Sequence, residues 1–410
     1  MACGHWGANT KMPLREIPVD ELQLGMYVSK LDRPWTETPF VFQGFILRNE
    51  KQIDVMKKYC SRVFVDPEKE DLSEVEAHAG GTAASIRGST VYREVASLDA
   101  ELPRARSAIA ETTIVLKQIT QAVEAGGAIE SAKVKEAASD ITESVVRNPD
   151  AATLLVQLQE KSDETFNRAI HVSVMMSIFG RFLQLPSERI EHLGLLGLLQ
   201  DAGKLKLPTA LLNKREPFTA EEEALYQTHV DHSVEILNST PGLPNDLPGL
   251  ASLHHEHFDG SGYPRGLRGG AIALAGMIAG IVDAFDTLIA PLPHGKHMSP
   301  SNALNLIYKG RGTQFQPALV EQFIQCVGVY PVGSAVELNT GETGIVIAQN
   351  PLRRLQPRVM VVKDAKGYEN RPYKMLDLSK EPRATPEEPY RIRRTLEYDA
   401  IKVDPRELFL

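Results

Sequence analysis

The chain has 410 residues, of which 42% are hydrophobic and 24% are charged, a composition typical of soluble globular proteins. This length exceeds one ordinary hydrophobic core, so we expect two or three domains. The formal net charge of −8 argues against general binding of nucleic acid or of an anionic membrane, and we expect neither as a partner. A small phosphate ligand is still compatible with this charge, because a metal ion supplies positive charge locally.

The cysteines and the N-terminus indicate the compartment. Cys3, Cys60 and Cys326 lie far apart, without the spacing of a disulfide framework or a zinc site, which is typical of a reducing cytoplasm. Residues 1–12 lack the apolar core of a signal peptide, and no run of about 18 apolar residues occurs. We therefore predict a cytoplasmic protein without a transmembrane helix.

The N-terminal part, residues 13–67, mixes short apolar stretches with turns and predicts a small α+β domain. It contains one or two strands over 40–47, a helix over 53–59 and a strand over 62–66. Sensing or interaction is one open role for it, and a folded cap or docking module without a ligand is the other. Residues 68–91 are rich in small and charged residues and predict a flexible linker.

Residues 92–148 predict a helical connector. Spaced aliphatic residues indicate amphipathic helices over 91–124 and 128–146, which are separated at Gly126 and Gly127. A packed helical pair is one interpretation. The other is a dimerising or signal-relaying helix, which would make the protein a homodimer.

Residues 149–331 predict an all-α domain of the bundle type, in which inward-facing side chains can build a metal site. Thr219 starts a capping-box pattern with Glu222. The expected helices cover residues 151–161, 164–183, 187–199, 220–237, 247–257, 274–288 and 300–308.

The pattern changes to a β-rich extension over residues 332–410. Alternating or β-branched runs predict strands over 334–339, 343–348 and 358–362, and the stretch from 391 onward is expected to be a surface extension. The predicted fold class is mainly α, with a small α+β domain before the helical domain and a short β-rich tail after it.

Two stretches carry the chemistry. The first is His254-His255-Glu256-His257-Phe258-Asp259-Gly260-Ser261-Gly262-Tyr263-Pro264, in which metal-ligand residue types precede a glycine-rich turn. A polar helix end with solvated histidines is the alternative interpretation. The second stretch, Leu198 to Pro208, places Asp201 and Lys204 directly after an apolar helical run.

The two stretches, their order and their separation resemble the HD-GYP family of bacterial cyclic di-GMP phosphodiesterases, a branch of the HD metallophosphohydrolases. The resemblance covers roughly residues 160–330, and residues 15–66 resemble the small domain that often precedes this module. It implies an HD-type helical bundle and a metal-dependent hydrolysis of cyclic di-GMP to pGpG, GMP or both.

The resemblance also implies a metal-ligand set. The positions that match it are His171, Asp201, His229, His254, His255 and Asp283, together with Gln200, where the family has a histidine. A glutamine carbonyl is a weaker donor than an imidazole, so one metal position is expected to lose affinity. Asn167 stands where members with three metals have a glutamate, so we expect two ions at most. These ligands suit Fe, Mn, Zn or Ni and do not identify the metal.

Residues that contact the substrate are implied in the same way. Lys204 matches a lysine near the phosphate, and Asp201 and Lys204 are the implied catalytic residues. Leu292 and Gly295 stand where the family has basic residues that contact phosphate, for which Lys296 partly compensates. The other implied substrate contacts form the loop whose ring would stack on guanine: Gly262, Tyr263 and Pro264.

Two functions remain open from the sequence. The first is a cyclic di-GMP phosphodiesterase weakened by the loss of one histidine ligand. The second is a catalytically degenerate cyclic di-GMP effector or protein-interaction module, which uses the Gly-Tyr-Pro loop and contacts diguanylate cyclases or other signalling proteins. Loss of a ligand and of two phosphate contacts favours the second, and retention of most ligands favours the first.

Overall fold

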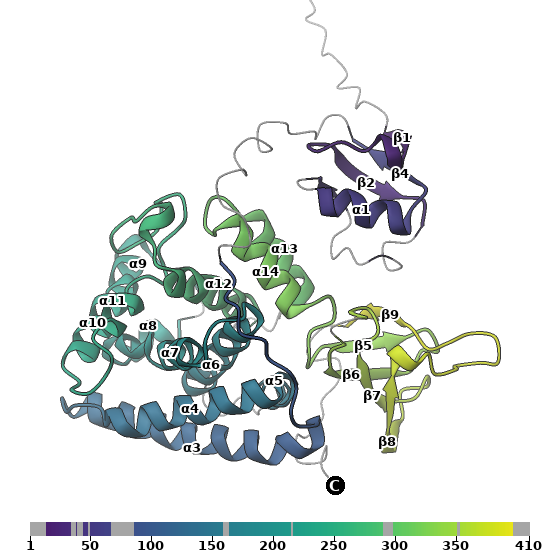
Figure 1. The fold of residues 1–410 in the computed structure, drawn as a ribbon. Coiled ribbons are helices and arrows are strands. Elements are labelled where there is room, and N and C mark those ends of the chain that lie inside the picture. The colour runs from purple at the N-terminus through teal and green to yellow at the C-terminus, as the bar shows by residue number, and fades with distance from the viewer. Residues whose placement is uncertain are drawn as a thin grey trace, which may run out of the picture. The chain divides into compact units, whose positions relative to one another are not determined.

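The computed structural model of this chain describes residues 14–33, 38, 44–47, 50–66, 86–158, 164–214, 216–289, 298–350 and 353–396. The chain divides into two compact units, residues 1–85 and 86–410. Each unit is described by itself (Figure 1).

The first unit is an antiparallel sheet with one helix. The strands are β1 (Arg15–Pro18), β2 (Tyr27–Leu31), β3 (Phe45–Ile46) and β4 (Arg62–Val65), in the order β1-β4-β2-β3, and the helix is α1 (Glu50–Tyr59). Its core contains the fully buried Val28, Met56 and Val63. The predicted α+β fold is confirmed. Residues 40–43 of the predicted strand lie outside the described residues.

The second unit begins with residues that the sequence assigned to the linker. The Gly88 N–H donates to the carbonyl of Leu183 at 2.8 Å, and the Thr90 N–H donates to that of Gln184 at 3.1 Å. The last residues of the predicted linker, 86–91, are therefore part of the second unit. Residues 68–85 lie outside the described residues.

A pair of long helices follows, α3 (Leu98–Glu124) and α4 (Ser131–Arg147), which run side by side in Figure 1. They are separated at Gly126 and Gly127, as the sequence predicts. Ser97 caps α3 by accepting from the Ala100 N–H.

The remaining helices build the body of the unit. They are α5 (Pro149–Leu158), α6 (Glu164–Phe182), α7 (Ser187–Leu199), a 3₁₀ helix (Ala202–Lys206), α8 (Thr209–Leu212), α9 (Ala220–Gln227), α10 (His229–Asn238), α11 (Leu247–Ala251), α12 (Leu274–Ile289), α13 (Pro300–Lys309) and α14 (Pro317–Val327). The capping box predicted at Thr219 is present at the start of α9. The sequence did not predict α14, α8 or the 3₁₀ helix.

Two predicted helices end early, and side chains contact the backbone carbonyls at both ends. The expected helix over 220–237 breaks at Thr228, where the Thr228 hydroxyl donates to the Leu225 carbonyl and the His229 ring contacts the Tyr226 carbonyl. Those carbonyls would otherwise accept from the next helical turn.

The expected helix over 247–257 also ends early, at Ala251. The Ala251 carbonyl contacts Nδ1 of His254 at 2.7 Å, a side-chain contact that competes with the helical hydrogen bond from the His255 N–H. His254 and His255 therefore lie in a turn, and the prediction that they are helical was wrong.

The C-terminal sheet is larger than predicted. It has the antiparallel order β8-β7-β6-β5-β9, formed by β5 (Ala335–Leu338), β6 (Thr343–Ala348), β7 (Arg358–Lys363), β8 (Glu369–Asp377) and β9 (Ile392–Thr395). The expected surface extension from 391 thus contains β9, in which Thr395 pairs with Val336 of β5. No helix within the described ranges is long and apolar enough to cross a membrane.

One buried ion pair fastens α3 to α4. The Glu101 carboxylate is fully buried and accepts three hydrogen bonds of 2.9–3.1 Å from Nε and Nη2 of Arg147. The same arginine also contacts Glu143 at 3.1 Å, but the Glu143 side chain is 62% exposed. The two carboxylates therefore share a partner and differ in burial.

We expect Arg147→Ala to lower the free energy of unfolding of this unit by about 3 kcal/mol, because it leaves the Glu101 carboxylate buried without a counter-charge. Glu143→Ala is the matched control and should cost less than about 1 kcal/mol, since the pair that it removes is exposed. Urea unfolding followed by far-UV circular dichroism measures both. An equal loss of unfolding free energy in the two variants would show that the buried pair stabilises the unit no more than the exposed pair does.

Candidate metal centre

Asp201 is positioned by a close contact between the 3₁₀ helix and α10. A Cβ atom at Gly203 would lie 2.0 Å from the His229 carbonyl oxygen and 2.4 Å from the Ser233 nitrogen, so only glycine allows this approach. The Gly203 N–H also donates to Ser233 Oγ at 2.8 Å. The contact brings Asp201, two residues earlier, next to His229.

Backbone carbonyls orient two histidines of the site. Nδ1 of His229 lies 2.6 Å from the Tyr226 carbonyl oxygen, and Nδ1 of His254 lies 2.7 Å from that of Ala251. A carbonyl oxygen can only accept, so each Nδ1 carries the proton and donates. In the neutral rings the two Nε2 atoms are therefore unprotonated and available as ligands.

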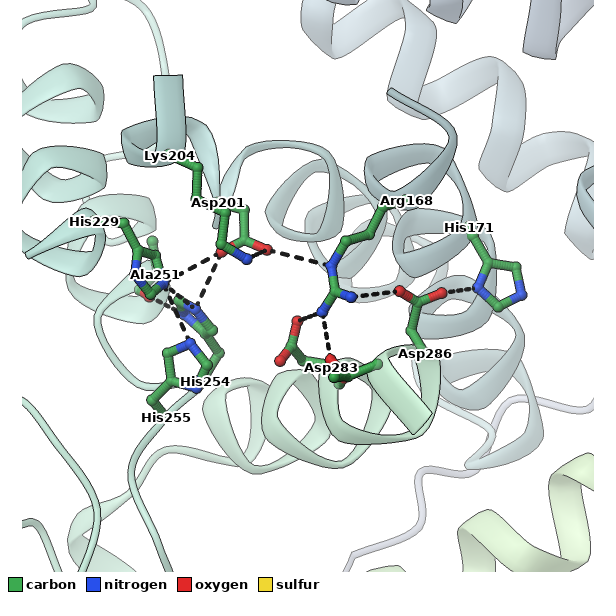
Figure 2. A network of polar contacts seen from close by, with 11 residues as sticks. Arg168, His171, Asp201, Lys204, His229, Ala251, His254, His255, Asp283 and Asp286 are labelled. Atoms are coloured by element: carbon green, nitrogen blue, oxygen red, sulfur yellow. Dashed lines mark hydrogen bonds and ion pairs between the residues drawn. The ribbon is translucent and has the colours of Figure 1, made fainter. Parts of the chain in front are cut away.

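Four ligand atoms converge in this way (Figure 2). Asp201, His229, His254 and His255 each place one ligand atom within 4.8 Å of the others. Asp201 Oδ1 lies 3.4 Å from His229 Nε2 and 3.5 Å from His254 Nε2. His229 Nε2 lies 3.4 Å from His254 Nε2 and 3.2 Å from His255 Nε2. Tetrahedral ligands at about 2.0–2.1 Å from one ion are separated by about 3.3–3.4 Å, which is close to these four distances.

The protonation pattern shows that this group fits a cation. The Nε2 atoms of His229 and His254 are acceptors, as is the Asp201 carboxylate, so no proton is available to join them to one another. Within the described part of the chain, Asp201 Oδ1 has no hydrogen-bond partner. Buried acceptors that face each other are costly, and a shared metal ion removes that cost.

Electrostatics keeps the ligands in the forms that a metal requires. Burial lowers the pKa of His229 to about 4 and that of His255 to about 2, so both rings are neutral near pH 7. Burial alone would raise the pKa of Asp201, but the Lys204 ammonium, 2.7 Å from Asp201 Oδ2, outweighs it and holds that pKa well below its ordinary value. Asp201 is thus a carboxylate and Lys204 an ammonium, and both belong to the centre.

The Gly-Tyr-Pro loop holds His255 in place. A Cβ atom at Gly262 would lie 2.2 Å from the His257 nitrogen and 2.4 Å from the His255 carbonyl oxygen, which a side chain would displace. The Tyr263 N–H donates to the His255 carbonyl at 3.0 Å, and the two rings stack with centroids 4.7 Å apart. Pro264 continues the loop, so the glycine and the tyrosine of the motif position a ligand.

Glu256 and Asp259 of the first motif form hydrogen bonds within this loop and are not part of the four-ligand group. The buried Glu256 carboxylate accepts from the N–H groups of Arg265 and Leu267 at 2.8 and 2.7 Å. Asp259 accepts from the Ser261 N–H at 2.9 Å. These bonds close the loop around Gly262.

Two of the implied ligands are held elsewhere. His171 Nδ1 contacts the Asp286 carboxylate, and His171 Nε2 lies 2.8 Å from the Gln157 side-chain nitrogen. Asp283 accepts from Nη2 of Arg168 at 2.7 Å. As Figure 2 shows, Arg168 lies between Asp201 on one side and Asp283 and Asp286 on the other. The structure therefore does not bring His171 or Asp283 into the four-ligand group.

The remaining predicted site residues differ in how far the structure describes them. Gln200 ends α7 with only 1% of its surface exposed, and neither atom of its amide has a hydrogen-bond partner among the described residues. Lys296, Leu292 and Gly295 lie outside the described residues, so their phosphate roles stay predictions from the resemblance.

Sequence reasoning missed Arg168 and Asp286. Arg168 precedes His171 by three residues on α6, and Asp286 follows Asp283 by three on α12, so each pair shares a helix face. Charged residues at this spacing on two apolar helices were a signal that these helices meet through ion pairs.

Comparison with known proteins shows which domains and proteins this chain resembles. Residues 153–319 match the HD domain, residues 14–134 match a domain of unknown function (DUF3391), and residues 335–385 match a KOW domain associated with the HD domain. The cyclic di-GMP phosphodiesterase PA4108 of Pseudomonas aeruginosa is 29% identical over 373 residues, which are 90% of this chain and 89% of that protein.

Two further relatives match over smaller shares or at lower identity. The 3'3'-cGAMP-specific phosphodiesterase 2 of Vibrio cholerae is 35% identical over 190 residues, which are 42% of this chain and 36% of that protein. The solved structure of Bd1817, a HDG"Y"P protein from Bdellovibrio bacteriovorus, is 13% identical with a TM-score of 0.47, and the match covers 76% of this chain and 98% of that one.

The fold is that of an HD-type helical domain whose His and Asp side chains can hold a metal ion. Residues 153–319 match the HD domain, and the similarity to a cyclic di-GMP phosphodiesterase along most of the chain supports the resemblance to the HD-GYP family.

We predict that His254→Ala lowers the affinity for a transition-metal ion by more than about 100-fold, because it removes a preoriented ligand. His171→Ala should leave that affinity unchanged, since His171 contacts Asp286 and Gln157 instead. Metal content after dialysis, measured by elemental analysis, compares the two variants, and circular dichroism checks that both are folded. If folded His171→Ala loses its metal, His171 of α6 is a ligand and the ion does not lie in the four-ligand group alone.

Proposed function

We propose that this protein hydrolyses cyclic di-GMP at the centre formed by Asp201, His229, His254 and His255. The observation that carries the proposal is the convergence of four ligand atoms, from the two motifs and from His229 of α10, with Lys204 beside them. The similarity to the phosphodiesterase PA4108 along 90% of this chain supports the choice of substrate.

The reaction consumes one water molecule. The water oxygen forms a bond to phosphorus and the bond from phosphorus to the ribose 3′ oxygen breaks. That oxygen takes up one proton, and the second proton of the water stays on the new phosphate or passes to solvent. One such cleavage gives the linear dinucleotide pGpG, and a second gives GMP. A divalent ion of the Fe, Mn, Zn or Ni type, when bound, supplies Lewis-acid chemistry to the phosphodiester.

The chain's own residues have separate tasks in this proposal. Asp201 and the three histidines hold the ion. The Lys204 ammonium attracts the diester phosphate and carries a proton next to the leaving oxygen. Asp201 keeps that proton on Lys204, because the carboxylate outweighs the effect of burial and raises the pKa of the ammonium. Tyr263, which already stacks on His255, would offer its ring to a guanine base.

A second candidate function is binding of cyclic di-GMP with little or no turnover. It is favoured by the buried Gln200 amide, which lacks partners among the described residues, and by the engagement of Asp283 and His171 in other contacts. In this role the nucleotide would act as an effector, and the Gly-Tyr-Pro loop would contact other signalling proteins.

We expect Asp201→Asn to reduce hydrolysis of cyclic di-GMP by at least about 100-fold, because the substitution removes both a metal ligand and the counter-charge of Lys204. Asp231→Asn on the exposed surface of α10 is the control and should keep full activity. Product formation by chromatography and nucleotide binding by calorimetry are measured on the same metal-loaded samples.

The result decides between the two candidates. Turnover by the unmodified protein that Asp201→Asn abolishes supports the phosphodiesterase. Tight nucleotide binding without turnover in the unmodified protein, under every metal tested, supports the effector. Absence of both binding and turnover would contradict both.

A further inference from the structure

Arg168 on α6 lies at the centre of a group of three acidic side chains. Its Nη2 donates to Asp283 Oδ1 at 2.7 Å, its Nη1 lies 3.2 Å from Asp286 Oδ2, and its Nε lies 3.8 Å from Asp201 Oδ2. In Figure 2 the guanidinium fills the space between Asp201 and the two aspartates of α12. It is the group that connects the four-ligand site to His171.

We propose that Arg168 takes the place of a second metal ion. The centre then binds one divalent ion through Asp201, His229, His254 and His255, and the guanidinium supplies the second positive charge as a permanent part of the chain. The sequence led us to expect two ions at most, and this proposal narrows that number to one. It concerns the number of ions alone, so it stands whether or not the protein cleaves cyclic di-GMP.

The first argument is the availability of ligand atoms. A second ion would need Asp283 and His171, together with the second oxygen of Asp201. Asp283 Oδ1 accepts from Arg168, and Asp201 Oδ2 contacts Lys204. Both ring nitrogens of His171 are engaged, one by Asp286 and the other by Gln157. Each of these three side chains therefore already has a partner inside the chain, whereas the Gln200 amide has none among the described residues.

The second argument is charge. Three buried or nearly buried carboxylates, one guanidinium and one ammonium leave a single net negative charge at the centre, counting Asp201, Asp283, Asp286, Arg168 and Lys204. One divalent ion more than neutralises it. A second divalent ion would lie against the guanidinium and leave excess positive charge in a largely buried site, which is unfavourable.

The third argument is that the guanidinium cannot leave its place easily. Nη2 of Arg168 also donates to the hydroxyl of Thr287 at 2.7 Å, which in turn donates to the Asp283 carbonyl. Arginine is not deprotonated in proteins, so no change of pH in the physiological range empties the position. An ion could enter only by breaking these contacts.

The position also allows Arg168 to face a ligand. A cavity of about 50 Å³ is lined by Arg168, Asp201 and Lys204 on one side and by Leu116 and Ile119 of α3 on the other. Within the described residues, Nε of Arg168 has no hydrogen-bond partner. The two cations that flank Asp201 therefore border the same space.

The test counts ions. The unmodified protein is stripped with a chelator, reloaded separately with Mn²⁺ and Zn²⁺, freed of excess metal and measured by elemental analysis. We expect one ion per chain, and Arg168→Ala should raise this to two because it frees Asp283 Oδ1 and removes the positive charge that lies between Asp201 and the two aspartates of α12. Lys206→Ala, which removes a surface ion pair with Glu235, is the control of equal charge change and should keep one ion.

Two further variants keep the test decisive if Arg168→Ala does not fold. Arg168→Lys retains the positive charge and should still bind one ion. Gln200→His adds an imidazole while Arg168 remains, so it should also bind one ion. Two ions per chain in the unmodified protein would overturn the proposal, as would two ions in Arg168→Lys or in Gln200→His. Loss of the only ion from folded Arg168→Ala would overturn it too, because Arg168 would then serve to position Asp201.

Discussion

The centre depends on where two backbone carbonyls lie. Tyr226 and Ala251 each present a carbonyl to Nδ1 of a histidine, and this fixes the proton on the far side of each ring from the site. Two helices end close to these carbonyls, at Gln227 and at Ala251. The consequence of the contacts is that unprotonated nitrogens of His229 and His254 converge on Asp201. The ligand geometry is therefore set where two helices end.

The second constraint is compensation of buried charge. Asp201, Asp283 and Asp286 come from different parts of the domain, and burial tends to raise the pKa of both Asp201 and Asp283. Arg168 and Lys204 counter this tendency, so both carboxylates keep a lowered pKa. These contacts bring α6, α12 and the end of α7 together. The ion pairs thus hold the domain together at the place where the ligands must be oriented.

The sequence predicted part of this arrangement, for identifiable reasons. The contiguous His254-His255 motif and the Asp201 stretch are local patterns, and with His229 they converge in the structure, although their role as ligands stays a prediction. His171 was assigned from the resemblance alone. Its ring pairs with Asp286, a contact between distant helices that the spacing within one helix does not determine. Arg168 was missed because a charged residue on a helix usually faces solvent.

The fold shows the same division between local and long-range information. The start and end of α7 and the capping box of α9 follow from local chemistry and were predicted. Strand β8 was missed because it is mostly exposed and lacks an apolar face of its own, and β9 because it is completed only by pairing with β5. Both strands obtain their stability from neighbours far away in the chain.

The departures from the family pattern are connected through the guanidinium of Arg168. A buried glutamine at position 200 is a poor metal ligand, and by itself it indicates decay of a site for two ions. With a guanidinium already between Asp201 and Asp283, a further imidazole at this position would gain no ion to bind. Gln200 and Arg168 are then consistent with each other, as parts of a centre that holds one exchangeable ion and one fixed positive charge. On this view, loss of a ligand histidine is compatible with a working site, because the charge that it helped to hold is supplied by the chain.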